Sequence, residues 1–349
     1  MKAGRIDEQA QGFLFRLLPI IVACLSAAPS RADDSFFENR TIILIVSGGG
    51  AYDAYARLVA RYLPRYIKGT PKIVVQNFPG GGGIRAASYL FKIAPKDGST
   101  IAAVHGSVIT APVLVPELVD FDTNKFGWIG NITSDVYIGY VKNDSPIQSM
   151  DDLKTTEMIA GATVLGTAGV DMAVLAREIF QLKVKLIAGY KNSEDIKLAM
   201  DRGEVQGTMA SGWFSLKRSS LWADRKVRIL FQWGSERNKE LQDVPLFLSL
   251  ATDDRQRAML KLMSMREEIS KPYMAPPGTP PERLKIYRDA FQAMVADPEF
   301  VAEARKQALD VEDPMSGENL QELIRQLNAT PKNVSSTLVN LFTEYNRRN

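Results

Sequence analysis

The stretch that decides the fold is Thr41-Ile42-Ile43-Leu44-Ile45-Val46, which Ser47-Gly48-Gly49-Gly50 follows directly. A β-branched, apolar run of this kind is typical of a parallel strand that is buried on both faces. The glycines end the strand, and apolar residues at helical spacing from Tyr55 to Leu63 predict a helix after them. Pro64 is expected to end or kink that helix.

The same strand, loop and helix recur downstream. Residues 72–76 predict a second strand, the glycine-rich loop 79–83 leads into a helix over 84–93, and residues 101–104 predict a third strand. A second series starts near Tyr137, with strands predicted over 158–164, 183–187, 205–209 and 227–233. Strands that alternate with helices imply βαβ crossovers and parallel sheets, so the sequence predicts an α/β fold.

The pattern changes at Lys271. Residues 271–275 predict a strand that runs into a proline-rich turn, and the remainder predicts mainly helix. Thr279 is expected to cap the first of these helices, with Pro280 at its first position and Glu282 completing a capping box.

Length and composition describe an ordinary soluble protein with room for two domains. The 349 residues exceed one small core, and 45% hydrophobic with 24% charged residues excludes disordered and collagen-like classes. Without residues 1–32 the chain carries 39 basic and 38 acidic residues, a net charge of +1. This balance indicates no nucleic acid or other polyanionic partner.

The N-terminal segment 1–32 has the layout of a secretory signal peptide. Basic residues lead, residues 17–25 form a short apolar core, and Ser30-Arg31-Ala32 offers small residues at a cleavage site. The apolar run is shorter than the roughly 20 residues that span a bilayer. We therefore predict export to the periplasm; a buried N-terminal helix is the alternative.

Cys24 is the only cysteine, and it lies inside this segment. The mature chain would then have no disulfide and no thiol nucleophile. Residues 21–24 loosely resemble a bacterial lipobox. Lipid anchoring at Cys24 is therefore the minority alternative to a freely diffusing periplasmic protein.

Four predicted strands end in loops of small residues that lead into helices. These loops are Ser47–Gly50, His105–Ser107, Gly166–Gly169 and Ser211–Gly212. Ligands bind at the carboxyl ends of parallel strands, where helix N-termini favour an anion without needing Arg or Lys. A tight turn explains any one loop, whereas four together favour an anion-binding cleft.

Motifs for catalysis, nucleotides and metals are poor. Residues 81–86 fit G-x-G-x-x-A, yet the next strand ends at His105-Gly106 and not at the acidic residue that a dinucleotide site needs. His105 is the single histidine, no G-x-S-x-G motif is present, and a zinc site would need carboxylates for its other ligands. The sequence predicts no cofactor, no metal and no enzyme; a hydrolase or oxidoreductase that uses His105 is the weaker alternative.

Several side chains near the loops have both a structural and a functional interpretation. Asp53 is expected to complement its helix N-terminus and not to touch a ligand. Asp171 either caps its helix or faces the cleft, where it would repel a carboxylate or pair with an amine. His105 is either a loop residue whose hydrogen bonds are made within the protein or a hydrogen-bond donor to the ligand. Tyr190 and Trp213, just past strand ends, favour packing.

Taken together, these residues resemble the periplasmic receptors of tripartite tricarboxylate transporters, often called the Bug receptor family. The resemblance runs from about Ile42 to the C-terminal helices. The motifs that carry it, in order, are Gly49–Asp53, Val74–Gly83, Ala94–Gly98, Gly166–Gly169, Gly189–Lys191, Asp243–Pro245 and Ala275–Pro280. Each motif alone is weak, and their order and spacing make the match specific.

The resemblance implies a fold of the periplasmic-binding-protein type, with two Rossmann-like lobes and the ligand in the interlobe cleft. Lobe I would comprise residues 33–136 and 272–349, and lobe II residues 137–271. The protein would catalyse nothing; as a monomer it would capture a small carboxylated solute and deliver it to membrane transporter subunits. The alternative is a solute sensor for a membrane signalling partner.

By position, the resemblance places the carboxylate grip at Gly49–Asp53 and Gly166–Gly169. With the strand-end residues, the predicted ligand-binding set is Ser47, Gly49, Gly50, Ala51, Tyr52, Asp53, His105, Ser107, Thr167, Ala168, Gly169, Asp171, Tyr190, Ser211 and Trp213. Family members commonly carry Ser-Thr in place of Ala51-Tyr52, and a small hydroxyl residue in place of Asp171-Met172. These departures favour a smaller, amine-bearing or more apolar acid over a plain tricarboxylate.

Overall fold

The computed structural model describes residues 34–47, 51–78, 80, 83–163 and 166–348. The predicted signal peptide, with Cys24, and the predicted site residues Gly49 and Gly50 lie outside these ranges. In the described part of the chain, no helix combines the length and the apolar character that crossing a membrane requires.

The first lobe is built on a six-stranded mixed sheet with the order β11-β4-β10-β3-β1-β2. Its strands are β1 (Thr41–Val46), β2 (Lys72–Asn77), β3 (Thr100–Ala103), β4 (Gly127–Asn131), β10 (Pro272–Ala275) and β11 (Met315–Ser316). The three N-terminal strands are parallel, whereas β10 runs antiparallel between β3 and β4. The strands predicted at 41–46, 72–76, 101–104 and 271–275 are confirmed.

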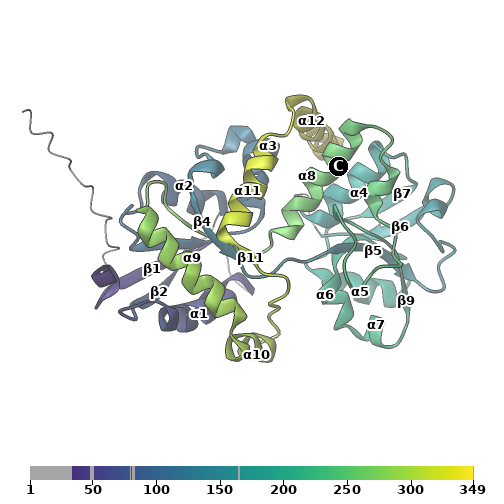
Figure 1. Ribbon diagram of the computed structural model, residues 1–349. Coiled ribbons are helices and arrows are strands. Elements are labelled where there is room, and N and C mark those ends of the chain that lie inside the picture. Colours follow the sequence, from purple (N-terminus) through teal and green to yellow (C-terminus); the bar gives the residue numbers. More distant parts are fainter. Residues whose placement is uncertain (1–33, 48–50, 79, 81–82, 164–165, 349) are drawn as a thin grey trace, which may run out of the picture. The chain divides into compact units, whose positions relative to one another are not determined.

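Helices cover this first sheet, and Figure 1 shows them grouped around it. They are α1 (Ala51–Tyr62), α2 (Ile84–Lys92), α3 (Ser107–Leu114), α9 (Pro281–Ala296), α10 (Pro298–Lys306) and α11 (Gly317–Asn328). The α1 helix ends at Tyr62 and passes into a 3-10 turn, Leu63–Tyr66, as Pro64 predicts. Its buried face packs on β1, where Ile42 and Leu44 are fully buried.

The second lobe has a five-stranded sheet with the order β7-β6-β8-β5-β9. Its strands are β5 (Tyr137–Lys142), β6 (Met158–Gly161), β7 (Val184–Ile187), β8 (Gly207–Gly212) and β9 (Val227–Gln232). Its helices are α4 (Ala168–Glu178), α5 (Ser193–Asp201), α6 (Trp213–Lys217), α7 (Ser220–Ala223) and α8 (Asp254–Glu268). Strand β6 is parallel to β7 and β8, and β5 is antiparallel to β8 and β9.

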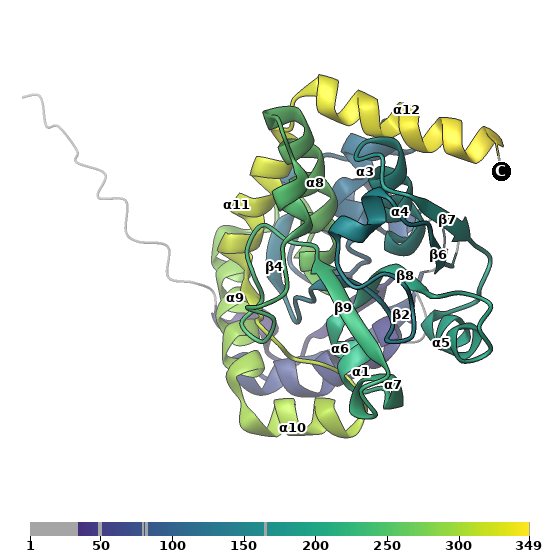
Figure 2. The ribbon, with the colours of Figure 1, turned by 90° about the vertical axis from the view of Figure 1, so that its right-hand side faces the viewer.

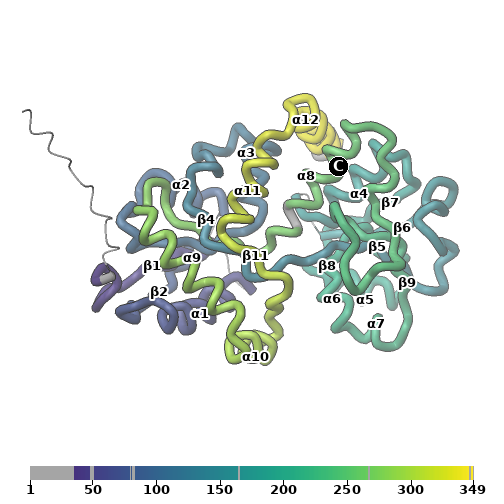
Figure 3. The backbone as a smooth tube through the Cα atoms, in the orientation of Figure 1, coloured from purple at the N-terminus to yellow at the C-terminus, as the bar shows by residue number. Residues whose placement is uncertain are grey.

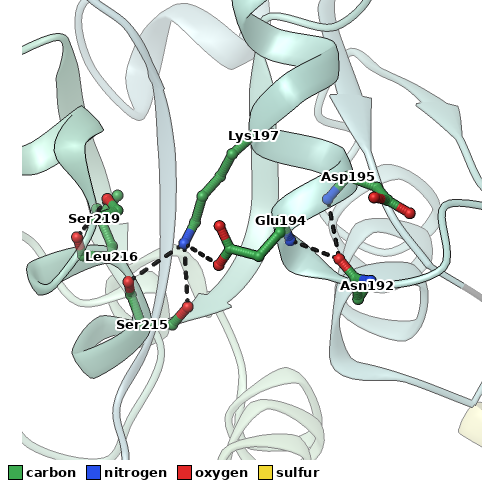
Figure 4. A network of polar contacts seen from close by, with 7 residues as sticks. All are labelled: Asn192, Glu194, Asp195, Lys197, Ser215, Leu216 and Ser219. Carbon is green, nitrogen blue, oxygen red and sulfur yellow. Dashed lines mark hydrogen bonds and ion pairs between the residues drawn. The ribbon is translucent and has the colours of Figure 1, made fainter. Parts of the chain in front are cut away.

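A buried lysine holds two helices of the second lobe together, as Figure 4 shows. Lys197 of α5 donates from Nζ to Glu194 Oε1 at 2.7 Å and to the carbonyl and hydroxyl oxygens of Ser215 in α6 at 3.4 Å each. The Asn192 side chain caps α5 by accepting the N–H groups of Glu194 and Asp195. A buried ammonium is tolerated only with such partners, so this network belongs to the framework.

The C-terminal helix α12 (Lys332–Arg348) packs against α3 of the first lobe and against α4 and α8 of the second. Figure 2 shows it running along α3 and α4. The chain trace in Figure 3 can be followed from β4 into β5 and back from α8 into β10. The remaining short 3-10 turns are Asp34–Phe37, Pro116–Leu118, Thr123–Lys125, Asp151–Lys154 and Phe247–Leu250.

The predicted capping box at the start of α9 is wrong. The helix begins one residue later than expected, at Pro281, and no side chain caps it. Thr279 is buried, and its hydroxyl donates to the Pro276 carbonyl at 2.9 Å. The Thr279 hydroxyl therefore hydrogen-bonds within the turn before the helix and does not cap α9.

Candidate functional site

The ends of β1 and β3 are tied to each other. The Ser47 hydroxyl, at the end of β1, accepts the backbone N–H of His105 at 3.1 Å. The rings of Tyr52, in the first turn of α1, and His105 lie 5.1 Å apart between centroids. Two loops that are 58 residues apart in sequence thus form one edge of a site.

The hydrogen bonds of His105 define its tautomer. Its Nδ1 accepts the backbone N–H of Ser107 at 3.1 Å and lies 2.8 Å from the Ser107 hydroxyl oxygen. An imidazole nitrogen that accepts an N–H carries the lone pair, so the ring proton is on Nε2. In this tautomer Nε2 is a hydrogen-bond donor and not a basic nitrogen.

Tyr52 links α1 to the connection that precedes β10. Its hydroxyl donates to the Ser270 carbonyl at 3.0 Å, and the Lys271 ammonium lies 4.3 Å from its ring centroid. A cation over a tyrosine face is attracted by the ring quadrupole. The Tyr52 side chain is thus held in place by contacts to Ser270 and Lys271.

Asp53 serves its own helix. Its carboxylate accepts from Arg57 Nε at 2.7 Å and from Asn77 Nδ2 at 3.0 Å. The Arg57 hydrogen bond holds the pKa of Asp53 below its usual value. Position in the first turn of α1 adds a favourable interaction with the helix dipole.

We expect Asp53→Asn to lower the free energy of unfolding at neutral pH by less than about 1 kcal/mol, because exposed ion pairs contribute little. Ligand affinity should stay within about two-fold of the parent protein. Chemical denaturation and calorimetric titration measure the two quantities. A ten-fold loss of affinity would show that Asp53 does contact the ligand.

Asp171 hydrogen-bonds to the loop that precedes α4. This residue is 3% exposed, and its Oδ1 accepts the backbone N–H of Gly166 at 3.0 Å. The Thr163 and Thr167 hydroxyl oxygens are 2.9 Å apart on the same turn. Asp171 therefore stabilises the loop ahead of α4.

The residues that cap α3 and α4 do so without a side-chain hydrogen bond. Gly106 caps α3 and Thr167 caps α4, and neither accepts a hydrogen bond from its helix through a side chain. Ala168 and Gly169, which open α4, pack closely, and a Cβ on Gly169 would lie 3.3 Å from the Ala162 Cβ. The N-terminal N–H groups of such helices are the usual partners of an anionic ligand.

A cavity of about 350 Å³ brings residues of the two lobes together, and we call it the α3–α12 chamber. The described residues that line it are Ser107, Thr110, Ala111, Leu114, Val115, Glu117, Gly166, Asp171, Val339, Phe342 and Thr343. It unites three positions predicted for the site and the carboxylate grip: Ser107, Gly166 and Asp171. The contributions of Thr110, Leu114, Val339 and Phe342 had no signal in the sequence, because they depend on where α12 packs.

Three predicted site residues are buried or pack within the second lobe. Trp213 is 3% exposed, donates from Nε1 to Glu240 at 2.7 Å and meets the Trp222 ring edge-on. Tyr190 packs on the core of the second lobe. Ser211 is buried beside Tyr140, whose pKa burial raises. The chamber contains none of these three among its described lining residues, and their assignment to the ligand stays a prediction.

A further buried acid lies on the connection between β4 and β5. Burial raises the pKa of Asp135 to about 7; the Asp310 carboxylate also raises it, while the backbone N–H of Phe214, 3.5 Å from Oδ1, and Lys271 oppose the shift. Asp310 itself pairs with Arg218. Among the described residues, no group of three His, Cys, Asp or Glu side chains could hold a metal ion.

The chain has two α/β lobes, and residues at the starts of α3 and α4, one helix from each lobe, line the same cavity. This arrangement defines a two-lobed solute-binding protein. The chain belongs to the tripartite tricarboxylate transporter family receptors, because the profile of that family matches residues 56–336. No match was found among curated proteins.

Solved structures share this fold. A TctC solute-binding protein from Polaromonas aligns with a TM-score of 0.66 at 18% identity, covering 87% of this chain and 98% of that one. MatC from Rhodopseudomonas palustris, with bound malate, gives 0.57 at 17% identity and covers 87% and 99%. Another R. palustris protein, with adipate, gives 0.59 at 21% identity and covers 86% and 97%. At these identities the likeness shows the fold.

Proposed function

We propose that this chain is an exported receptor that captures a small carboxylate in its interlobe cleft and delivers it to the membrane subunits of a tripartite transporter. It acts in the periplasm, as a monomer, and performs no chemistry on the solute. Lobe I comprises residues 33–136 and 272–349, and lobe II residues 137–271. Ser107 and Asp171 of the predicted ligand-binding set line the α3–α12 chamber. The other members, apart from Asp53, are proposed as ligand contacts from the sequence.

The observation that carries this proposal is the convergence of the helix N-termini. His105 and Gly106 precede α3, which begins at Ser107, and the loop of Gly166 precedes α4; Ser107 and Gly166 both line one cavity. Backbone N–H groups and a partial positive charge at such ends stabilise a carboxylate. The relatives solved with malate and with adipate hold ligands of this chemistry.

The tautomer of His105 supports a binding role over a catalytic one. In a Ser–His–Asp relay, the imidazole donates Nδ1–H to a carboxylate and keeps Nε2 free to take a proton. Here Nδ1 accepts the Ser107 N–H, so the protonation pattern is the reverse. His105 is suited to donate a hydrogen bond from Nε2 to an anion.

Calorimetric titration with malate, adipate, citrate and neutral amino acids tests the proposal, alongside mass spectrometry of the denatured protein for a retained solute. A true ligand at 100 times its dissociation constant should raise the stability by about 2.7 kcal/mol. Ser107→Ala should weaken binding by about ten-fold, since a hydrogen bond to a charged group contributes about 1.5 kcal/mol or more.

The matched control is Ser336→Ala, because Ser336 is exposed on α12 and its hydroxyl bonds only within that helix. Its affinity should equal that of the parent protein. Turnover of a carboxylate ester or hydroxy acid that His105→Ala abolishes would contradict the proposal.

A further inference from the structure

Five apolar side chains line the α3–α12 chamber. Ala111 and Leu114 come from α3, Val115 follows that helix, and Val339 and Phe342 come from α12. Ser107, at the first position of α3, and Gly166, just before α4, lie at the end where the N–H groups are. The chamber therefore has a polar end at Ser107 and Gly166 and an apolar wall, with Glu117 beyond Val115.

The size of the chamber suits the tail of a small organic acid. A cavity of about 150 Å³ lined by apolar residues holds benzene. The α3–α12 chamber has a volume of about 350 Å³, which is enough for one ring or a chain of several methylene groups. Its volume lies within the range of ligand pockets, about 300–1,000 Å³.

The charges of the chamber are unfavourable to a second carboxylate. Asp171 and Glu117 both line it, and none of its described lining residues is Lys, Arg or His. Asp171 is almost fully buried and already accepts the Gly166 N–H. A second carboxylate at the far end of the chamber would meet a like charge on Glu117, which follows Val115 beyond the C-terminal end of α3.

The C-terminal helix fixes the far wall. Phe342 packs against the buried cluster that contains Val170 and Val174 of α4, together with Leu341 and Tyr345 of its own helix. Thr337 accepts a hydrogen bond from Arg255 of α8. These contacts hold Val339 and Phe342 in position, so the wall is preformed by the fold.

We propose that the α3–α12 chamber binds the uncharged, apolar tail of the solute, so that this receptor selects monocarboxylates over dicarboxylates. The carboxylate lies at the N-terminus of α3, beside Ser107, and the tail extends toward Val339 and Phe342. This inference rests on the proposed function and narrows its substrate class.

The test uses three acids that each have six carbon atoms: hexanoate, adipate and 6-aminohexanoate. Their far ends are a methyl group, a carboxylate and an ammonium group. We expect hexanoate to bind at least ten-fold more tightly than either of the others. In the series from butyrate to hexanoate, affinity should rise by about four-fold per methylene, as each buried CH₂ contributes about 0.8 kcal/mol.

Val339→Trp should fill the chamber and weaken hexanoate by at least ten-fold, with a smaller effect on butyrate. Asn340→Trp is the matched control, because Asn340 is the next residue of α12, is exposed and is not among the lining residues. If Val339→Trp unfolds, Val339→Ala gives the same test with the opposite change in volume. The enlarged chamber should then raise the affinity for heptanoate relative to that for hexanoate.

Each binding result tests either the apolar-tail proposal or the proposed function. Tighter binding of adipate would overturn the apolar-tail proposal and leave the carboxylate receptor intact. Tighter binding of 6-aminohexanoate would also overturn it, in favour of an ammonium held by Asp171 and Glu117. An unchanged hexanoate affinity in Val339→Trp would exclude the chamber as the site. Failure of every acid to bind the parent protein would contradict the proposed function itself.

Discussion

Gly207→Ala is expected to lower the free energy of unfolding by at least about 3 kcal/mol, in the range of large steric substitutions in cores. A Cβ on Gly207 would lie 2.0 Å from the Tyr140 carbonyl oxygen and 2.8 Å from the Val141 Cα. These are backbone atoms of β5, which pairs directly with β8 in this register. Relief of the clash would separate two central strands of the second sheet.

Gly203→Ala provides the matched control for this effect, four residues earlier in the chain. Gly203 has a positive φ of 74°, and nothing lies within 4 Å of a Cβ placed there. Its cost should be only about 1 kcal/mol, from the left-handed backbone conformation. Denaturant unfolding followed by circular dichroism measures both variants. Equal losses would show that backbone conformation, and not crowding against β5, governs these positions.

Asp135→Asn is expected to stabilise the protein at pH 8 by about 2 kcal/mol. The pKa of the carboxyl is raised to about 7 in the folded protein. In the unfolded chain it titrates near 4. The full difference of about three pH units corresponds to about 4 kcal/mol, and partial access of solvent to the side chain reduces it by about half.

The sign of the pH dependence follows from proton binding. Between about pH 4 and pH 7 the folded protein retains the Asp135 proton that the unfolded chain has lost, so the parent protein loses stability as the pH rises through this window. Above about pH 7 the loss is complete and constant. The amide that replaces the carboxyl in Asp135→Asn does not titrate, and it keeps an oxygen that can accept the Phe214 N–H.

The stability difference between the two proteins should therefore be near zero at pH 4 and grow until about pH 7. Denaturant unfolding of both proteins at several pH values measures it. Asp53→Asn is the control of opposite sign, because its lowered pKa makes the ionised form stabilising. A difference that does not vary with pH would show that the pKa of Asp135 is the same in the folded and the unfolded protein.

Much of the fold could be predicted because its strands combine β-branched residues with glycine at their ends. Strand β4 could not, since Gly127 and Gly130 read as strand breakers. The structure explains them: a Cβ on Gly130 would lie 2.3 Å from the Phe291 ring, so tertiary packing demands a glycine there. Helix α8 was also missed, because charged residues such as Arg255, Arg257 and Lys261 interrupt its apolar pattern.

The candidate site was predictable where strand ends and helix starts alternate in the sequence. Ser47, His105 and Ser107 meet through short-range hydrogen bonds of two such loops. The apolar wall of the chamber was not predictable, because Val339 and Phe342 lie more than 160 residues from Gly166 in the sequence. Only the packing of α12 brings them there.

The order of the first sheet has a consequence for how the chain folds. Strand β10 lies between β3 and β4, yet it follows β3 by roughly 170 residues. All strands of the second sheet lie within the intervening segment, from β5 to β9. The second lobe can therefore assemble from contiguous chain, whereas the first sheet stays open at its centre until residues 272–275 are in place. Pairings this distant in sequence form slowly, because a long loop must close first. Strand β10, which completes the first sheet, should be among the last segments to gain protection from hydrogen exchange during refolding.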